Sequence, residues 1–142
     1  MVAYSFKSGF VPLIHEGSKQ QTIRRPRKRH ARAGEPLQLF TGPRMKPVRL
    51  GAAQCVAVRD VRLDFNDQRV TLDDAVAIED PSELDAFAIR DGFTVPPRLI
   101  ATVRPWWYMA KWWAQTHPGQ PVFRGVLIDW GDTFRPVAEA VS

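Results

Sequence analysis

The chain has 142 residues, of which 44% are hydrophobic and 25% are charged. This composition predicts a single globular domain over residues 1–142 and excludes a disordered, collagenous or coiled-coil chain. The net charge of +5 is uneven, because residues 1–50 hold 11 Lys and Arg against two Glu, whereas residues 51–142 hold 9 against 13 acids. Residues 19–32, which we call the basic segment, contain seven cations and no acid.

Three further features of the sequence bear on the cellular location of the protein and on whether it binds metal. No apolar run reaches the roughly 18 residues of a membrane-spanning helix, and the first ten residues lack the pattern of a signal peptide. The single cysteine, Cys55, cannot form an internal disulfide, and with three scattered histidines it supplies no zinc site. We therefore expect a cytoplasmic protein without membrane contact, metal or cofactor, in which Cys55 is a small core residue.

The first part of the chain predicts three strands and one short helix. Residues 3–10 alternate as a first strand, and residues 11–17 favour a helix that ends at Gly17 in a left-handed cap. Residues 20–24 are short and β-prone, and residues 37–41 form a strand after the basic segment.

Further strands are predicted in the second part. Residues 55–65 alternate hydrophobic side chains with one slip of phase near Asp60, which indicates a long strand with a bulge. A turn at residues 66–67 makes a hairpin with a strand over residues 69–73, and residues 121–130 form a closing strand. We expect the tail, residues 131–142, to be frayed.

Helical signals lie between these strands. Asp80 predicts the start of a helix that ends at Gly92 and places Asp91 at the helix end. A second helix is expected over about residues 97–116, with Pro105 either kinking or restarting it. Strands outnumber helices and do not alternate regularly with them, so we expect an α+β fold with a small open barrel of about five to six mostly antiparallel strands and flanking helices.

The second helix is rich in tryptophan. Its helical spacing predicts a buried stripe of Trp106, Met109 and Trp113. Trp107 or Trp112 then lies at the border of the stripe, where an indole either covers a neighbouring loop or stacks on a base.

Residues 17–24 carry the clearest chemical signal. If residues 20–24 are extended, Gln20, Thr22 and Arg24 share one face, and Lys19 can fold toward the same side. A lysine whose pKa is lowered by desolvation or by neighbouring cations can act as the base that activates a hydroxyl. The alternative interpretation is a polar turn between a helix and a strand.

The pattern Gly17-x-Lys19-x-x-Thr22-x-Arg24 resembles the GxKxxTxR signature of the ASCH family at all four positions. Residues 34–37 (GEPL) resemble the family's GD-x-L entry to the next strand, and residues 87–93 (FAIRDGF) fall where members carry an acidic residue after a short helix. Residues 117–120 (HPGQ) are similar to the PGQ stretch of small members that hydrolyse N4-acetylcytidine. The resemblance covers about residues 4–130 and implies the RNA-binding PUA-like fold, a small β-barrel with flanking helices.

The resemblance also implies a catalytic set. Those hydrolases use a Thr, a Lys and a Glu, so the matching positions give Thr22 as nucleophile, Lys19 as its base and Asp91 in place of Glu. Aspartate is one methylene shorter, and a misplacement of about 1 Å can lower a rate roughly 100-fold. The interpretation of Asp91 as an ordinary helix-end residue stays open.

Two functions follow as expectations. The first is an amidohydrolase that removes an acyl group from N4 of cytidine or from a related modified base. The second is a noncatalytic module that binds RNA or another single strand, and a ribonuclease falls between them. The candidate residues for contacts with nucleic acid are all cationic: Arg24, Arg25, Arg27, Lys28, Arg29, Arg32, Arg44 and Lys46. The alternative for the basic segment is a solvated loop.

Overall fold

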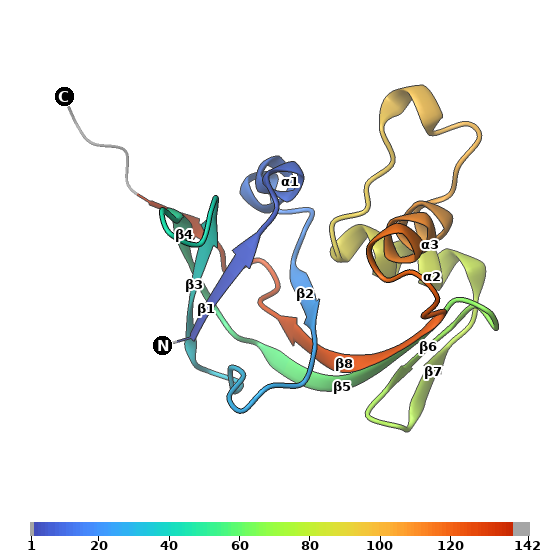
Figure 1. Cartoon of the computed structure of the whole chain (residues 1–142), viewed down its shortest axis with the longest axis horizontal. Helices are drawn as coiled ribbons and strands as arrows, with labels where there is room; N and C mark the ends of the chain where they lie inside the picture. The colour runs from blue at the N-terminus through green and yellow to red at the C-terminus, as the bar shows by residue number, and fades with distance from the viewer. Residues whose placement is uncertain (1, 138–142) are drawn as a thin grey trace.

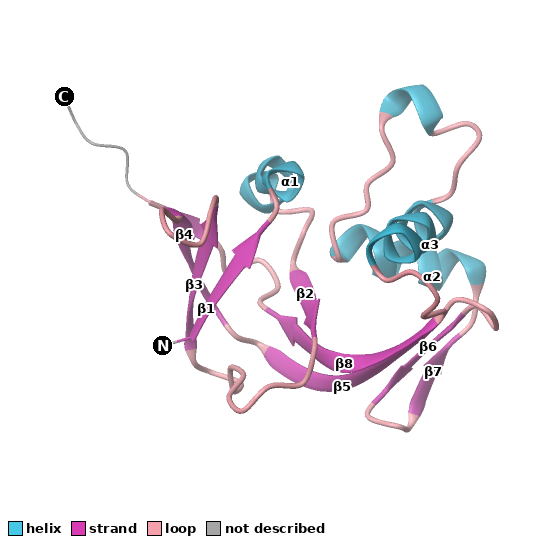
Figure 2. Ribbon diagram, in the orientation of Figure 1, coloured by secondary structure: helices cyan, strands magenta, loops and turns pink. Residues whose placement is uncertain are grey.

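The computed structural model describes residues 2–137, whose strands form two sheets (Figures 1 and 2). The first sheet has the order β1-β3-β4-β9 and the second the order β2-β8-β5-β6-β7. The first contains β1 (Val2–Phe6), β3 (Pro36–Thr41), β4 (Val48–Gln54) and β9 (Arg135–Pro136). The second contains β2 (Gln21–Arg24), β8 (Val122–Asp129), β5 (Ala57–Asp64), β6 (Arg69–Leu72) and β7 (Val76–Ile78).

The α+β class is confirmed, and all strand pairs but one are antiparallel within the described residues. Two details of the expectation need correction. The described residues form nine strands rather than five or six, because β4, β7 and β9 carry no clear alternation in the sequence. They also lie in two separate sheets, of four and five strands, where one small open barrel was expected.

The helices are η1 (Ser8–Phe10), α1 (Val11–Glu16), α2 (Pro81–Arg90), η2 (Pro97–Leu99) and α3 (Pro105–Thr116). The carboxylate of Asp80 accepts hydrogen bonds from the backbone N–H groups of Ser82 and Glu83, which caps α2 as the sequence predicts. Pro105 starts α3 instead of kinking a longer helix, because proline is tolerated in the first turn, where no partner for its missing N–H is needed. Figure 1 shows α2 and α3 together over the curved pair β5 and β8.

The second sheet is covered on both faces by hydrophobic residues. On β8, Phe123 and Leu127 pack into one core with α2 and α3, whereas Ile128 packs into the other core with the first sheet. On β5, Val58 and Val61 likewise point to different cores. This exchange of faces explains the slip of phase near Asp60, where the predicted bulge is wrong because the pairing of β5 with β8 runs without interruption. The shift of register lies in β3 instead, between Leu39 and Phe40.

The parallel pair joins β1 to β3, and this pairing requires a long crossover. Residues 7–35 supply it, with η1, α1, β2 and the basic segment in succession. β2 pairs with β8 in the second sheet, so the chain visits both sheets before it returns to β3. This excursion places the residues of the ASCH-like signature between the two sheets.

Several smaller predictions are confirmed. Trp106, Met109 and Trp113 are buried while Trp107 is exposed, and Cys55 is buried in the core.

Of the tail expected to be frayed, residues 138–142 lie outside the described residues, but Arg135–Pro136 form β9 against β4. Among residues 2–137, no helix is both long and apolar enough to cross a bilayer.

Gly125 sets how closely β2 approaches β8, and this gives a first prediction. A Cβ at Gly125 would lie 2.4 Å from the carbonyl oxygen of Arg24 and 2.5 Å from the ring of Phe123, so β2 must shift to admit it. Gly125→Ala should lower the free energy of unfolding by about 1–3 kcal/mol, measured by urea denaturation. Gly9→Ala is the control, because no heavy atom lies within 4 Å of a Cβ built there. Equal urea midpoints for the two variants would contradict this packing.

Candidate active site

The turn after α1 directs Lys19 into the interior. Gly17 ends α1 with a left-handed φ of 87°, as predicted, and the backbone N–H of Lys19 then donates to the carbonyl of Leu13. The next residue is tied to the end of α2, because the backbone N–H of Gln20 donates to the carbonyl of Arg90 at 2.8 Å. The Lys19 side chain is therefore buried, with 3% of its surface exposed.

Asp91 caps the carboxyl end of α2 and faces the same interior space. The residue after it, Gly92, has a φ of 101°, and a Cβ there would lie 2.8 Å from the ring of Phe10 and 2.9 Å from Cδ of Lys19. Glycine is required at this position for both reasons: the backbone is left-handed and the stem of Lys19 passes directly over it.

The ammonium group of Lys19 has few polar neighbours for a buried cation. Nζ donates a hydrogen bond of 2.5 Å to the backbone carbonyl of Asp91. It also lies 4.7 Å from the ring centre of Phe10 and 5.5 Å from that of Phe6, where the faces of the rings attract a cation. Burial lowers the pKa of Lys19 to about 8, the carboxylate of Asp91 opposes this shift, and the charge of Arg24 adds to it.

Burial acts on Asp91 in the opposite direction. It raises the pKa of the Asp91 carboxyl to about 6, against the charge of Lys19, a hydrogen bond from Gln21 and the charge of Arg24. The Gln21 bond is long, at 3.4 Å between Nε2 and Oδ1. Both pKa values therefore move toward neutrality, as groups that exchange protons near pH 7 require.

Thr22 and Arg24 lie on one face of β2, as the sequence predicts. Nε of Arg24 donates to Oγ1 of Thr22 at 2.9 Å, and Nη2 donates to the carbonyl of Ser5 at 2.7 Å. The Arg24 guanidinium also lies over the rings of Tyr4 and Phe6, at 5.4 and 5.0 Å from their centres. Because the Thr22 oxygen accepts from Arg24, its own hydrogen is free to be donated elsewhere.

These residues surround one cavity of about 260 Å³. Six of the residues that line it have charged or hydroxyl side chains: Lys7, Lys19, Thr22, Arg24, Arg25 and Asp91. Its other side, which we call the aromatic wall, consists of Phe10, Phe93, Trp112, Trp113, His117 and Phe123. The rings of the wall pack against one another. The ring centres of Phe93 and Trp112 are 5.4 Å apart, and His117 is stacked on Trp113 with ring centres 4.4 Å apart. The cavity can therefore hold a planar ring beside a lysine, a hydroxyl and a carboxyl group.

Lys19, Thr22 and Asp91, the predicted catalytic residues, line the same cavity but do not all contact one another through their side chains. Within residues 2–137, no hydrogen bond joins Lys19 to Thr22, and no ion pair joins Lys19 to the Asp91 carboxylate. Lys19 uses the backbone oxygen of Asp91 instead. The carboxyl group and the ammonium group therefore both keep capacity for a further partner.

The predicted nucleic-acid residues divide into two groups. Arg24 and Arg25 line the cavity, whereas the others do not. Arg27, Lys28, Arg29 and Arg32 lie on the loop between β2 and β3, and Arg44 and Lys46 lie in the exposed turn between β3 and β4. The structure therefore does not gather all eight cations at one place.

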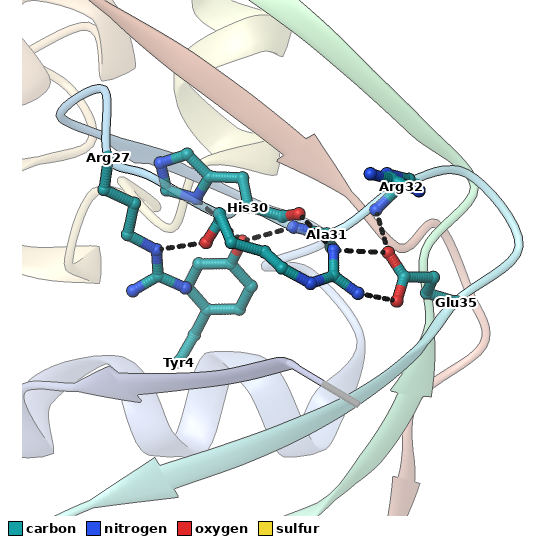
Figure 3. Close-up of polar contacts among 7 residues, drawn as sticks. Tyr4, Arg27, His30, Ala31, Arg32 and Glu35 are labelled. Atoms are coloured by element: carbon teal, nitrogen blue, oxygen red, sulfur yellow. Dashed lines mark hydrogen bonds and ion pairs between the residues drawn. The ribbon is translucent and has the colours of Figure 1, made fainter.

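The loop of the basic segment is folded by specific contacts, and Figure 3 shows those among Tyr4, Arg27, His30, Ala31, Arg32 and Glu35. His30 bridges Tyr4 and the carbonyl of Arg25, with distances of 2.9 Å from Nδ1 to the Tyr4 hydroxyl and 2.8 Å from Nε2 to the carbonyl. Arg29 forms a two-pronged ion pair with Glu35, at 2.6 and 3.2 Å. The guanidinium of Arg27 lies 4.8 Å above the ring centre of Tyr4. Arg29 is therefore partly neutralised, while Lys28 and Arg32 are exposed and form no ion pair in the described residues.

Sequence reasoning missed part of the site. Gln21, the hydrogen-bond partner of Asp91, lies between two residues of the predicted face, where alternation suggests the opposite side. Lys7 and Phe10 fall in what the sequence presents as a continuing first strand, and His117 is one of three scattered histidines that the sequence assigns to no site. Trp112 was placed correctly at the border of the buried stripe. No local pattern indicates that residues so far apart in the chain meet.

The raised pKa of Asp91 predicts a dependence of stability on pH. Between the ordinary value of 3.8 and about 6, the folded chain holds a proton that the unfolded chain has lost. The free energy of unfolding should therefore fall as pH rises through this window. Asp91→Asn removes the titration and should reduce that fall by on the order of 2–3 kcal/mol, measured by urea unfolding between about pH 4 and pH 6.

Asp67→Asn is the matched control, because Asp67 is exposed and lies outside the cavity. It should retain the pH dependence of the unmodified chain. The same pH dependence in Asp91→Asn would show that the Asp91 carboxyl titrates normally.

Comparisons with known proteins bear on the fold. No protein-family model matches the chain, and no curated protein matches it by sequence. A crystal structure of a tyrosine-to-phenylalanine mutant of the ASCH protein from Zymomonas mobilis is similar, with a TM-score of 0.50 and 16% identity over 95% of this chain and 73% of that one. The structure of ASCH from Zymomonas mobilis gives 0.49 and 14% over 94% and 70%. The first likeness is one of fold: this chain has the overall fold of an ASCH domain.

Proposed function

We propose that this chain is a hydrolase of the ASCH type that removes an acyl group from N4 of cytidine or of a related modified base. One observation carries the proposal. Lys19, Thr22 and Asp91 line the same cavity, and all three are buried. The PUA-like barrel implied by the resemblance belongs to the same proposal, since the two sheets with their curved pair β5 and β8 are compatible with an open form of it.

Thr22 is the proposed nucleophile. A free hydroxyl is a weak nucleophile and needs help to lose its proton. The hydrogen bond from the positive Arg24 guanidinium to Oγ1 stabilises negative charge on that oxygen, so it favours the developing alkoxide. The same contact leaves the Thr22 proton free to pass to a base.

Lys19 is the proposed base. With its pKa lowered to about 8, a useful fraction of the side chain is neutral near pH 7 and carries a lone pair that can accept a proton. Nζ bonds the Asp91 carbonyl in this structure, so the proton passes to Lys19 after a rotation of its side chain or through a bridging water. Catalytic hydrogen bonds often tighten only when substrate is bound.

The reaction balances with these three groups. Oγ1 of Thr22 bonds to the acyl carbon as its proton passes to Lys19, and the bond from that carbon to N4 then breaks. N4 takes up a proton from the Asp91 carboxyl, whose raised pKa keeps it partly protonated near pH 6. Water then hydrolyses the acyl ester on Thr22, which releases the acid and restores the hydroxyl group, and the proton held by Lys19 returns to the Asp91 carboxylate. The aromatic wall supplies a surface on which the base can stack.

Aspartate in place of the family's glutamate is accommodated by position. Asp91 lines the cavity from the end of α2, and Gly92 allows Lys19 to pass close beside it. The shorter side chain therefore still faces the space in which Thr22 and Lys19 lie. This supports a catalytic role for Asp91 over that of an ordinary helix-end residue.

A second candidate function is a noncatalytic RNA-binding module, or a ribonuclease, that uses the same cavity. The observation in its favour is the loop of the basic segment, which is held in a defined shape by His30 and Glu35 and leaves Lys28 and Arg32 exposed. A free nucleoside has no backbone for these cations to hold. Their presence favours a substrate or partner with several phosphates.

The hydroxyl of Thr22 gives the test of the hydrolase. Thr22→Val keeps the shape of the side chain but removes the nucleophile, so release of cytidine from N4-acetylcytidine should fall at least ~100-fold, measured by chromatography. Valine is preferable to alanine because Thr22 is buried and a smaller side chain would leave a cavity. Thr22→Ser should retain activity, because it retains the hydroxyl.

Thr71→Val is the matched control, since Thr71 lies on β6 and outside the cavity. It should hydrolyse N4-acetylcytidine at the unmodified rate. Full activity in Thr22→Val would exclude Thr22 as the nucleophile.

The exposed cations of the loop give a separate prediction. If Lys28 and Arg32 touch phosphates, the double variant Lys28→Ala/Arg32→Ala should lower the slope of log affinity against log salt by about 1.4 for single-stranded RNA. Hydrolysis of a free nucleoside should not change. The measurement is a binding titration at three or more salt concentrations.

Arg98→Ala/Lys111→Ala is the control, because it removes the same charge from exposed positions on η2 and α3. If both double variants leave the salt slope unchanged, the basic segment is a solvated loop. If both lower it equally, the effect comes from net charge rather than from this loop.

A further inference from the structure

We infer that the cavity binds a nucleotide rather than a free nucleoside, with Lys7 and Arg25 holding its phosphate at the mouth. The inference rests on the proposed function and adds to it the form in which the base is presented. Neither residue belongs to the ASCH-like signature. Lys7 directly follows β1 and Arg25 directly follows β2, so the ends of two different strands bring them to one cavity.

Both side chains lie beside the aromatic wall. Nζ of Lys7 is 5.2 Å from the ring centre of Trp112. Burial lowers the pKa of His117 most, and the charges of Arg25 and Lys7 lower it further. Lys7 and Arg25 both line the cavity that this wall bounds.

The charges around the cavity are unbalanced. Four basic side chains line it, Lys7, Lys19, Arg24 and Arg25, against the single carboxyl group of Asp91. Within residues 2–137, neither Lys7 nor Arg25 forms an ion pair. Neighbouring cations without a counter-charge repel one another, and a phosphate group would relieve that repulsion. A neutral nucleoside would not.

The size of the cavity separates base from phosphate. Its volume of about 260 Å³ lies below the usual range of roughly 300–1,000 Å³ for sites that enclose a whole ligand. The buried part can take the base and its acyl substituent, and the sugar and phosphate then extend to the mouth. Lys7 and Arg25 are the exposed cations at that mouth, whereas Lys19 is buried.

Ligand binding tests this without relying on turnover. The probes are cytidine, cytidine 5′-monophosphate and cytidine 3′-monophosphate, titrated calorimetrically into the full chain at low salt. At least one monophosphate should bind about 10-fold or more tightly than cytidine, the effect of a charge-assisted hydrogen bond. Lys7→Ala and Arg25→Ala should each bring the ratio of the two affinities toward one.

Two controls separate phosphate binding by Lys7 and Arg25 from a general effect of positive charge and identify the source of the phosphate. Lys111→Ala and Arg98→Ala remove the same side chains from exposed positions away from the cavity and should keep the ratio. A short oligonucleotide with one N4-acetylcytidine, compared with the monophosphate as a competitor, shows whether the phosphate comes from a polynucleotide or from a free nucleotide. Either result agrees with the proposal.

Two results would overturn the inference and leave the hydrolase intact. In one, cytidine and both monophosphates bind equally while N4-acetylcytidine is still hydrolysed. In the other, Lys7→Ala and Arg25→Ala slow hydrolysis of the free nucleoside as much as that of its monophosphate, because the cations then act on Lys19 rather than on a phosphate. Failure of all three probes to bind, together with no hydrolysis, would remove the proposed function as well.

Discussion

The burial of the Lys19 ammonium group against the end of α2 is the interaction on which the site depends. A cation removed from water needs polar partners, and here the main one is a backbone carbonyl at the helix carboxyl end, where the helix dipole favours positive charge. The bond joins the turn after α1 to α2, and the contact between Gln20 and Arg90 reinforces it. Through it, β2 and the aromatic wall are held around one cavity. Gly92 is what allows the close approach.

The same arrangement leaves the charged groups of Lys19 and Asp91 without a full set of polar partners. Lys19 and Asp91 are close enough to influence each other's pKa, yet among the described residues they form no direct ion pair. A closed ion pair would stabilise both charges and hold both pKa values near or beyond their ordinary range. Burial without closure moves the two values toward each other instead. Such groups cluster at functional sites more often than in structural ion-pair networks, and the aromatic wall beside them supplies a surface for a planar ligand.

Local patterns predicted those parts of the fold that local interactions determine. Gly17 ends α1, Asp80 starts α2 and Trp106 begins the buried stripe, because a cap or a helical spacing needs only neighbouring residues. The bulge at Asp60 was wrong because β5 serves two cores, and β4 was missed because Gly51 and its alanine neighbours hide the alternation. The signature residues Lys19, Thr22 and Arg24 were found, since one short segment holds them. Gln21, Lys7 and His117 were not, because only the tertiary fold brings them to Asp91 and to the cavity.

Burial in this cavity shifts the protonation of the Asp91 carboxyl toward neutral pH. Nuclear magnetic resonance of the carboxyl carbons, with the Asp91 signal assigned by its loss in Asp91→Asn, measures that protonation directly. The Asp91 carboxyl carbon should titrate with a midpoint at about pH 6. A midpoint at the ordinary aspartate value, 3.8, would show that the carboxyl is solvated in the folded chain, and would contradict the site described.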